Sequence, residues 1–312
     1  MEEGANTHLP VLLEEVLAAL AIKKAGRYLD GTVGRGGHSA AILQTLSADG
    51  CLLMIDRDRA AVEAAKAQFE GDPRVRIEQG NFSAMRAIAE QIGLADGFDG
   101  ILLDLGVSSP QLDQPERGFS FSCDGPLDMR MDTGSGSTAA EWINSAGEKE
   151  IADVLWQFGE ERHSRRIARA IVTARGEAPL TTTGQLAGLI ADVIPRREPG
   201  KHPATRSFQA IRIHINAELD ALEKGLDAAL DLLRPGGRLC VISFHSLEDR
   251  RVKRFIRRHS LEDEAWRGLP DMPDSARPDM RPVGKAQRAS RAEVAANPRA
   301  RSAVLRVAER LH

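Results

Sequence analysis

Cysteine and aromatic residues are both scarce in this chain of 312 residues. Aromatics make up 4% of it, with one tyrosine, and the three cysteines are Cys51, Cys123 and Cys240. Cysteines so few and so far apart exclude a disulfide framework and a CxxC metal site. We therefore expect no metal, and a reducing compartment fits best.

Long hydrophobic runs are also lacking. No apolar run approaches the ~20 residues that span a bilayer, and the first ten residues do not have the pattern of a signal peptide. We expect a cytoplasmic protein with no membrane partner. With 42% hydrophobic residues the chain can form a real core, as one large domain or two smaller ones, which excludes disordered and collagen-like proteins.

Charge is nearly balanced overall but unevenly placed. The formal net charge is -3, yet residues 250–312 hold 16 Lys+Arg against 8 Asp+Glu, and residues 1–249 hold 26 against 37. A basic C-terminal fifth is a candidate phosphate-binding surface. On charge alone, a solvated helix face followed by a loose tail explains it equally well.

Short apolar strands alternate with helical patterns in the first hundred residues. The helical patterns cover residues 10–24, 38–46, 59–69 and 83–92, and the strands cover residues 27–30, 51–56, 75–78 and 100–104. Such alternation predicts an α/β fold with a doubly wound, mostly parallel sheet.

Helical patterns replace the strands between about residues 114 and 205. A long helix over 211–233 and a buried strand over 238–244 then resume the α/β pattern. The economical interpretation is a discontinuous domain, residues 1–114 and 206–312, interrupted by a helical insertion at 115–205. Near the C-terminal end of this domain, we expect residues 264–300 to form a loop and residues 302–309 to form a final edge strand.

Polar residues follow the first two strands. Asp30 precedes a turn containing Gly34, Gly36 and Gly37, and Asp56 stands 20 residues after Gly36. In open α/β sheets ligands bind at the carboxyl ends of the strands, and an acid at this spacing accepts hydrogen bonds from ribose hydroxyls. A tight strand-to-helix turn and a helix N-cap are the simpler alternatives.

The turn departs from a dinucleotide-binding motif. Ser39 occupies the third glycine position of G-x-G-x-x-G, and Asp30 would repel a pyrophosphate but attract an ammonium group. S-adenosylmethionine, with an amino acid end and a ribose, meets both demands. A nicotinamide dehydrogenase is the disfavoured alternative.

Two further strand ends carry polar side chains. Asp104 begins the string DLGVSSPQ, which contains Ser108 and Ser109, and His245 lies in FHSLEDR at 244–250. If the polar residues at these two strand ends had only structural roles, several independent helix caps or turns would be needed to account for them. For His245, a histidine satisfied by backbone groups is as good an explanation as catalysis.

Taken together, these strings resemble the MraW/RsmH family, the ribosomal RNA small subunit methyltransferases H. The strings that carry the resemblance are HLPVL (8–12), GRGGHS (34–39), DLGVSSPQLD (104–113), RGFSF (117–121), PLDMRMD (126–132), HPATRSFQA (202–210), FHSLEDR (244–250) and NPRARSA (297–303). The resemblance implies a class I, Rossmann-like fold. It also implies methyl transfer from S-adenosylmethionine to N4 of cytidine 1402 in the decoding region of 16S rRNA.

The resemblance also implies site residues. The cofactor contacts would be Gly36, Gly37, His38, Asp56, Phe82, Asp104 and Gln111, with Asp56 on the ribose and Phe82 beside the adenine. Many amino-methyltransferases carry an Asn/Asp/Ser-Pro-Pro-aromatic string after the fourth strand, where this chain has DLGV. The group that orients the amine is therefore left open.

The positions of the cysteines also agree with a nitrogen atom as the acceptor of the methyl group. C5 methylation of cytosine uses a cysteine nucleophile, but Cys51 and Cys240 fall inside predicted buried strands and Cys123 falls in the insertion. Our hypothesis is that Asp104, with Ser108 or Ser109, orients the amine, and that His245 shapes the pocket or relays a proton.

A base in folded RNA must be splayed out to reach such a site, which calls for phosphate contacts around it. The candidates are Arg130, His202, Arg206, Arg254 and Arg257. The expected partner is 16S rRNA or the small ribosomal subunit, with a homodimer left open. A non-catalytic RNA-binding assembly factor that keeps the cofactor fold is the remaining alternative.

Overall fold

The chain forms two compact units. The computed structural model describes residues 10–194, 202–262, 266, 273 and 276–312. One unit is Met1–Gly106 with Asp220–His312, and the other is Val107–Leu219. The expected insertion, residues 115–205, lies inside the second unit, which also includes helix α10 (Thr205–Ile215) because that helix packs against α7 (Glu148–Gly159).

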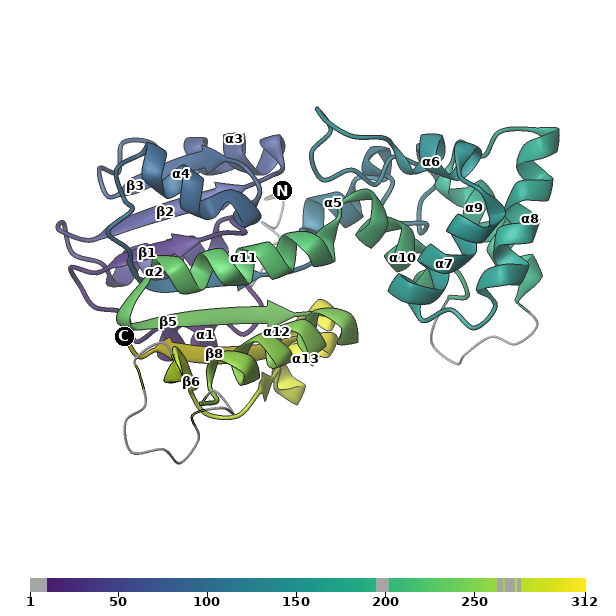
Figure 1. The fold of residues 1–312 in the computed structure, drawn as a ribbon. Helices are drawn as coiled ribbons and strands as arrows, with labels where there is room; N and C mark the ends of the chain where they lie inside the picture. The colour runs from purple at the N-terminus through teal and green to yellow at the C-terminus, as the bar shows by residue number, and fades with distance from the viewer. Residues whose placement is uncertain (1–9, 195–201, 263–265, 267–272, 274–275) are drawn as a thin grey trace. The chain divides into compact units, whose positions relative to one another are not determined.

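The first unit is built on an eight-stranded sheet with the order β3-β2-β1-β4-β5-β8-β6, and the eighth strand, β7, pairs with β8 beside this path (Figure 1). The parallel strands are β1 (Arg27–Asp30), β2 (Cys51–Asp56), β3 (Val75–Gln79), β4 (Phe98–Asp104) and β5 (Leu233–Ser243). The prediction of a doubly wound, Rossmann-like sheet is confirmed.

Helices cover both faces of this sheet. Neighbouring strand residues alternate between two cores: Tyr28 and Leu102 belong to one, Leu29 and Leu103 to the other. The first core is closed by α1 (Leu13–Leu20), α2 (Gly37–Thr45) and α3 (Arg59–Gln68); the second is closed by α4 (Met85–Gln91), α11 (Glu218–Leu232) and α12 (Ser246–His259).

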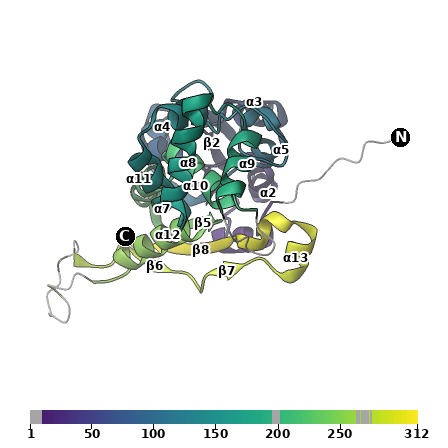
Figure 2. The same cartoon turned by 90° about the vertical axis from the view of Figure 1, so that its right-hand side faces the viewer.

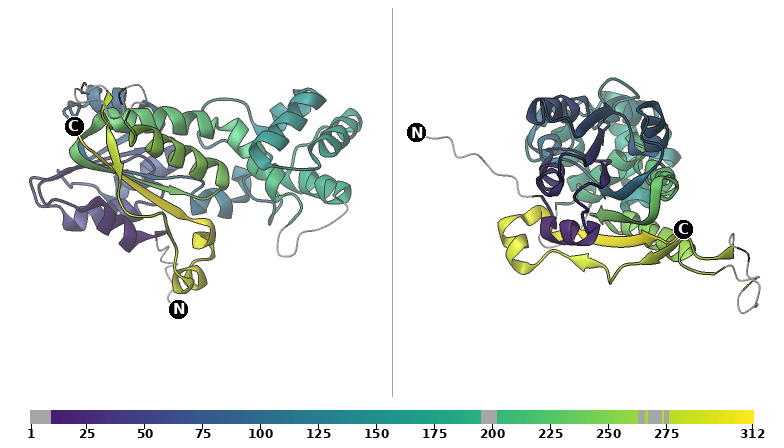
Figure 3. Two further views of the ribbon diagram at one scale, coloured as in Figure 1. Left: turned by 60° about the horizontal axis from the view of Figure 1, so that its bottom comes forward. Right: turned by 90° about the vertical axis from the view of Figure 1, so that its left-hand side faces the viewer.

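The C-terminal strand is not an edge strand, contrary to the sequence-based expectation. β8 (Val304–Arg310) pairs antiparallel with β5 on one side and with β6 (Met280–Pro282) and β7 (Gln287–Arg288) on the other (Figures 2 and 3). The expected loop at 264–300 therefore contains two strands, helix α13 (Arg291–Ala296) and the start of a 3-10 helix, η4 (Pro298–Ser302). Strands of two or three residues carry no periodic signal, and their partner is distant in sequence.

The second unit is helical. Its helices are α5 (Ser109–Asp113), η2 (Pro115–Arg117), α6 (Ala139–Ser145), α7, α8 (Ser164–Glu177), α9 (Thr183–Val193) and α10. They enclose a separate core that includes Ile151, Leu155, Ile167 and Ile211. In the described part of the chain, no helix of either unit is long and apolar enough to cross a membrane.

The helix expected over 211–233 is two helices, α10 and α11. The break lies at Ala217, whose φ is 47°. The buried side chain of Asn216 accepts a hydrogen bond from the Met131 amide (2.8 Å) and donates one to the Met129 carbonyl (2.8 Å). These contacts join segments 85 or more residues apart, so the helical periodicity could not reveal them.

Candidate active site

The turn between β1 and α2 requires glycine at two of its positions. Gly36 has φ = +70°, where a side chain is strained, and it forms the N-cap of α2. A Cβ on Gly37 would lie 2.4 Å from Cγ of Pro10. A larger residue is therefore excluded at Gly36 by the backbone conformation and at Gly37 by the Pro10 ring.

Asp30 lies buried at the end of β1, before this turn. Its carboxylate is 1% exposed and accepts hydrogen bonds from Ser39 Oγ (2.6 Å) and from the Thr32 amide (3.1 Å). Burial raises the pKa of Asp30. Ser39, which breaks the dinucleotide motif, thus anchors this buried acid.

Asp56 ends β2 and faces the glycine turn. Its two oxygens accept hydrogen bonds from the Gly34 and Asp58 amides, both at 2.8 Å. Burial raises its pKa to about 6, although both hydrogen bonds lower it. Each carboxylate oxygen accepts more than one hydrogen bond, so Asp56 retains capacity for ribose hydroxyls. The helix N-cap alternative belongs to Asp58, whose side chain caps α3.

Asp104 and His38 meet at the ends of β4 and α2. His38 is 6% exposed, and its Nε2 lies 3.0 Å from the Val11 carbonyl, so the neutral ring donates there and leaves Nδ1 as an acceptor. Nδ1 lies 3.6 Å from Asp104 Oδ2, beyond a normal hydrogen bond. Asp104 Oδ1 is buried with no hydrogen-bond partner among the described residues. The pair therefore has unused capacity to accept a proton.

Three carboxyl groups gather at the ends of β1, β4 and the start of α12. Burial raises the pKa of Asp104 well above its ordinary value, and the charges of Asp30 and Glu248 raise it further. Burial also lowers the pKa of His38, which keeps the ring neutral. The mutual repulsion of buried acids is relieved by a cationic ligand.

His245 is the N-cap of α12. Its Nδ1 accepts a hydrogen bond from the Glu248 amide at 3.4 Å, and Glu248 Oε2 accepts from the His245 amide at 3.2 Å and from the Phe244 amide at 2.8 Å. Glu248 is 2% exposed. His245 therefore has a structural role as a helix cap, one of the two explanations that the sequence left open. A role of His245 in shaping the pocket or relaying a proton stays a prediction.

Phe82 begins η1 (Phe82–Ala84) after β3 and rests against a glycine. A Cβ on Gly225 of α11 would lie 2.4 Å from Phe82 Cδ2, and a Cβ on Gly31 would lie 3.1 Å from Phe82 Cβ. Two glycines thus make room for one half-buried ring near the ends of β1 and β3. The contact between Phe82 and an adenine stays a prediction.

The remaining expected site residues belong to the second unit. Gln111 Oε1 accepts a hydrogen bond from the Ser108 amide (3.0 Å), which fixes the start of α5. Ser109 and Gln111 are 8% and 4% exposed. The expectation that Ser108, Ser109 and Gln111 complete the site stays a prediction.

The five expected RNA contacts differ in their availability. Arg130 donates two hydrogen bonds of 2.8 Å to Asp128, so one edge of its guanidinium group is already occupied. The exposed ring of His202 lies 4.6 Å from Phe121, and Arg206 donates to the Glu160 carbonyl. Arg254 and Arg257 are exposed on α12, and neither forms an ion pair with any described residue.

The comparisons with known proteins agree with one another. The model of the MraW methylase family matches residues 5–311. The chain belongs to this family. Curated relatives called ribosomal RNA small subunit methyltransferase H are 57% identical in Xanthomonas euvesicatoria pv. vesicatoria, over 100% of this chain and 91% of that protein, and 57% identical in Stenotrophomonas maltophilia, over 99% and 95%.

One solved structure, described as a putative rRNA methylase from Clostridium thermocellum, aligns with 97% of this chain and 99% of its own. The TM-score is 0.45 and the sequence identity is 10%, values too low to argue from. Family membership rests on the family model and on the curated relatives, and the strand order supports the fold independently.

The residues of the first unit fit S-adenosylmethionine, the cofactor expected in a methylase family. Asp56 provides acceptors for a ribose, and the acids Asp30, Asp104 and Glu248 favour a molecule with a sulfonium and an ammonium group. Asp104 Oδ1, buried with no hydrogen-bond partner in the described part of the chain, can accept a hydrogen bond from a ligand.

Sequence reasoning missed several contributors to this site. The Val11 carbonyl selects the His38 tautomer, and Gly225 makes room for Phe82. Glu248 follows His245 at capping-box spacing, which is a readable signal, but histidine is not a usual N-cap residue. The other contacts carry no local signal.

Proposed function

We propose that this protein transfers a methyl group from S-adenosylmethionine to the exocyclic N4 of cytidine 1402 in 16S rRNA. Membership of a methylase family and the acid-lined site support S-adenosylmethionine as the cofactor. The names of the curated relatives support small-subunit rRNA as the substrate. The observation that carries the choice of a nitrogen is Asp104, whose buried Oδ1 has no hydrogen-bond partner among the described residues and can accept an N4–H.

The amine of cytosine needs two kinds of help. Its lone pair is delocalised into the ring, so it must be held in line with the methyl group and relieved of a proton. The cofactor supplies the methyl group on a sulfonium sulfur. When the N–C bond forms and the S–C bond breaks, N4 gains a positive charge and one N4 proton must leave.

Asp104 is the group that we assign to receive this proton. The presence of a cation beside the acids lowers the pKa of Asp104, which makes its carboxylate form available. His38 Nδ1, 3.6 Å from Oδ2, is the next acceptor along the path. Asp104 thus orients the amine by accepting its N–H and then holds the proton at Oδ1 or Oδ2.

The cysteines support a nitrogen acceptor. Burial raises the pKa of Cys51, and it raises the pKa of Cys240 to about 12, so both thiols are neutral at physiological pH and poor nucleophiles. Cys123 is exposed in the second unit. A C5 mechanism, which needs a cysteine thiolate in the site, finds no candidate in the first unit.

The test is to map methylated nucleotides by mass spectrometry after incubating the protein with labelled cofactor and small subunits that lack the modification. We expect one new methyl group, on N4 of cytidine 1402, in the cytoplasmic small subunit. Methyl transfer to another atom or nucleotide would refute the proposal. RNA binding without any transfer would favour the non-catalytic assembly factor.

Asp104→Asn tests the assigned role. Loss of a positioned proton acceptor costs about 10²–10⁴-fold in rate, so kcat at saturating cofactor should fall by at least 100-fold. Asp49→Asn is the matched control, because Asp49 is an exposed acid outside the site. A folded Asp104→Asn protein that binds cofactor and methylates at the wild-type rate would contradict the assignment.

A further inference from the structure

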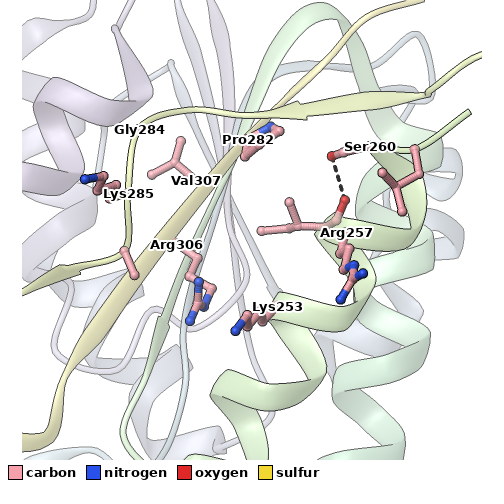
Figure 4. A pocket seen from close by; sticks show the side chains of 11 residues that line it. Lys253, Arg257, Ser260, Pro282, Gly284, Lys285, Arg306 and Val307 are labelled. Atoms are coloured by element: carbon pink, nitrogen blue, oxygen red, sulfur yellow. Dashed lines mark hydrogen bonds between the residues drawn. The ribbon is translucent and has the colours of Figure 1, made fainter.

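A cavity lies on the first unit, away from the strand ends that form the candidate active site. It has a volume of about 390 Å³ and lies between α12, the segment from β6 to β7, and β8 (Figure 4). This volume is within the range of about 300–1,000 Å³ that holds small ligands. Its lining consists of Lys253, Ile256, Arg257, Ser260, Leu261, Pro282, Gly284, Lys285, Ala286, Arg306 and Val307.

The floor of the cavity is apolar and its rim is cationic. Ile256, Leu261 and Val307 contribute apolar surface, whereas every charged residue in the described part of the lining is Lys or Arg. Figure 4 shows Lys253 and Arg257 on the α12 side and Lys285 on the opposite side. A ligand inside would therefore face positive charge from both sides.

The cations are not neutralised equally. Arg306 donates two hydrogen bonds to Asp249, at 2.7 and 3.0 Å, which hold it in place and offset its charge. Lys253, Arg257 and Lys285 form no ion pair with any described residue. Lys253 and Arg257 stand four residues apart, so they project from one face of α12. Within the described part of the chain, no acid neutralises these three positive charges, which can therefore attract an anion.

An apolar cavity bordered by available cations suits one kind of occupant. A nucleotide of single-stranded RNA has a flat base that can be buried and phosphates that bind Lys and Arg. A purely acidic segment would leave the apolar lining unfilled, and a purely apolar ligand would leave the cations unused.

We propose that this cavity binds one splayed nucleotide of the RNA substrate, with the base against Ile256, Leu261 and Val307 and the flanking phosphates on Lys253, Arg257 and Lys285. The proposal rests on the proposed function, since that supplies an RNA substrate. It makes the basic face of α12 a defined subsite that holds RNA outside the candidate active site.

The first test is the salt dependence of binding to a fluorescein-labelled, single-stranded oligoribonucleotide. Each phosphate contact to a single strand contributes about 0.7 to the slope of log K against log salt, so Lys253→Gln with Arg257→Gln should lower the slope by about 1.4. If affinities are equal at 1 M salt, binding at 0.15 M salt weakens by about 14-fold. Both residues are exposed, so the fold should survive.

The matched control removes two charges elsewhere. Lys24→Gln with Lys224→Gln changes net charge equally, and both side chains are exposed and outside the cavity. We expect the control to bind within about twofold of wild type. An equal loss in both proteins would mean that RNA responds only to total charge, which would overturn the subsite.

The second test separates the base from the phosphates. Ala286→Leu narrows the cavity without changing charge, and Ala286 is exposed, so the strand pairing should persist. With RNA containing 4-thiouridine, we expect photocrosslinks to peptides from residues 253–261 and 282–286, reduced several-fold by Ala286→Leu at an unchanged salt slope. Wild-type crosslinks confined to other peptides would overturn the proposal.

A third arm tests another class of ligand and keeps the two proposals apart. If phosphatidylglycerol vesicles bind wild type but not the Lys253→Gln/Arg257→Gln protein, while RNA binding is unaffected, the cavity takes a lipid and the RNA subsite is wrong. If RNA occupies the cavity but no methyl group reaches rRNA, the subsite stands and the proposed function fails. If rRNA is methylated and the variants bind RNA normally, the function stands and the subsite fails.

Discussion

Replacing Gly225 by alanine tests the expected adenine contact without touching the residue that makes it. The Cβ would lie 2.4 Å from Cδ2 and 2.7 Å from Cε2 of Phe82, so the ring must move. Glycine to alanine inside a helix gains about 1 kcal/mol, whereas overpacking costs about 1–3 kcal/mol. The free energy of unfolding should therefore change by no more than about 2 kcal/mol, and the protein should fold.

The affinity for S-adenosylmethionine should change much more than stability. Stacking of a base on an aromatic ring is worth about 1–3 kcal/mol, so displacement of Phe82 should raise the dissociation constant by roughly 5- to 150-fold. Phe82→Ala should give a loss in the same range. Titration calorimetry measures the affinity, and urea unfolding measures the stability.

Gly188→Ala is the matched control. Gly188 lies inside α9, and a Cβ there would meet no heavy atom within 4 Å. We expect this variant to gain about 1 kcal/mol in stability and to bind the cofactor like wild type. Wild-type affinity in both folded Gly225→Ala and Phe82→Ala proteins would refute the adenine contact.

Two further predictions concern titratable groups of the first unit. The pKa of Asp56 in the folded protein, about 6, exceeds its ordinary value of 3.8, so the folded state binds the Asp56 proton more tightly than the unfolded state does. This stabilisation is lost as the proton leaves, so the free energy of unfolding should fall by about 3 kcal/mol as pH rises from about 4 to 6. The difference between wild type and Asp56→Asn, measured by urea unfolding across this range, should show that step, and a pH-independent difference would contradict the assignment. The second prediction is that a folded protein in which Cys51, Cys123 and Cys240 are all replaced by alanine transfers methyl groups at a rate within about threefold of wild type, because the mechanism uses no thiolate. Complete loss of methyl transfer without loss of cofactor binding would instead indicate covalent catalysis by a cysteine.

The parts of the fold with local signals were predictable. The strands ending at Asp30, Asp56 and Asp104 are short apolar runs that end in an acid, and parallel pairing brings such ends to one edge of a sheet. The glycine turn was also visible, because Gly36 and Gly37 stand where backbone must pass closely.

The missing parts depend on contacts between distant segments. Asn216 breaks a helix whose apolar periodicity is continuous, because two backbone groups 85 or more residues away bind its side chain. The hydrogen bonds that Asp30 accepts from Ser39 and Thr32 were not predicted either, and its attraction for an ammonium group stays a prediction. The basic cavity beside α12 is formed by segments from three elements, and only its charge was visible in the sequence.

The position of β8 has a consequence for synthesis of the chain. Residues 238–243 of β5 pair with residues 304–309 of β8, so one edge of β5 has no partner until those late residues have left the ribosome. A nascent chain that has completed β5 therefore exposes a row of unsatisfied backbone groups, which invites pairing with other chains. A protein stopped before residue 304 would keep the glycine turn and Asp104 yet carry this open edge, and loss of the last strand should appear first as aggregation.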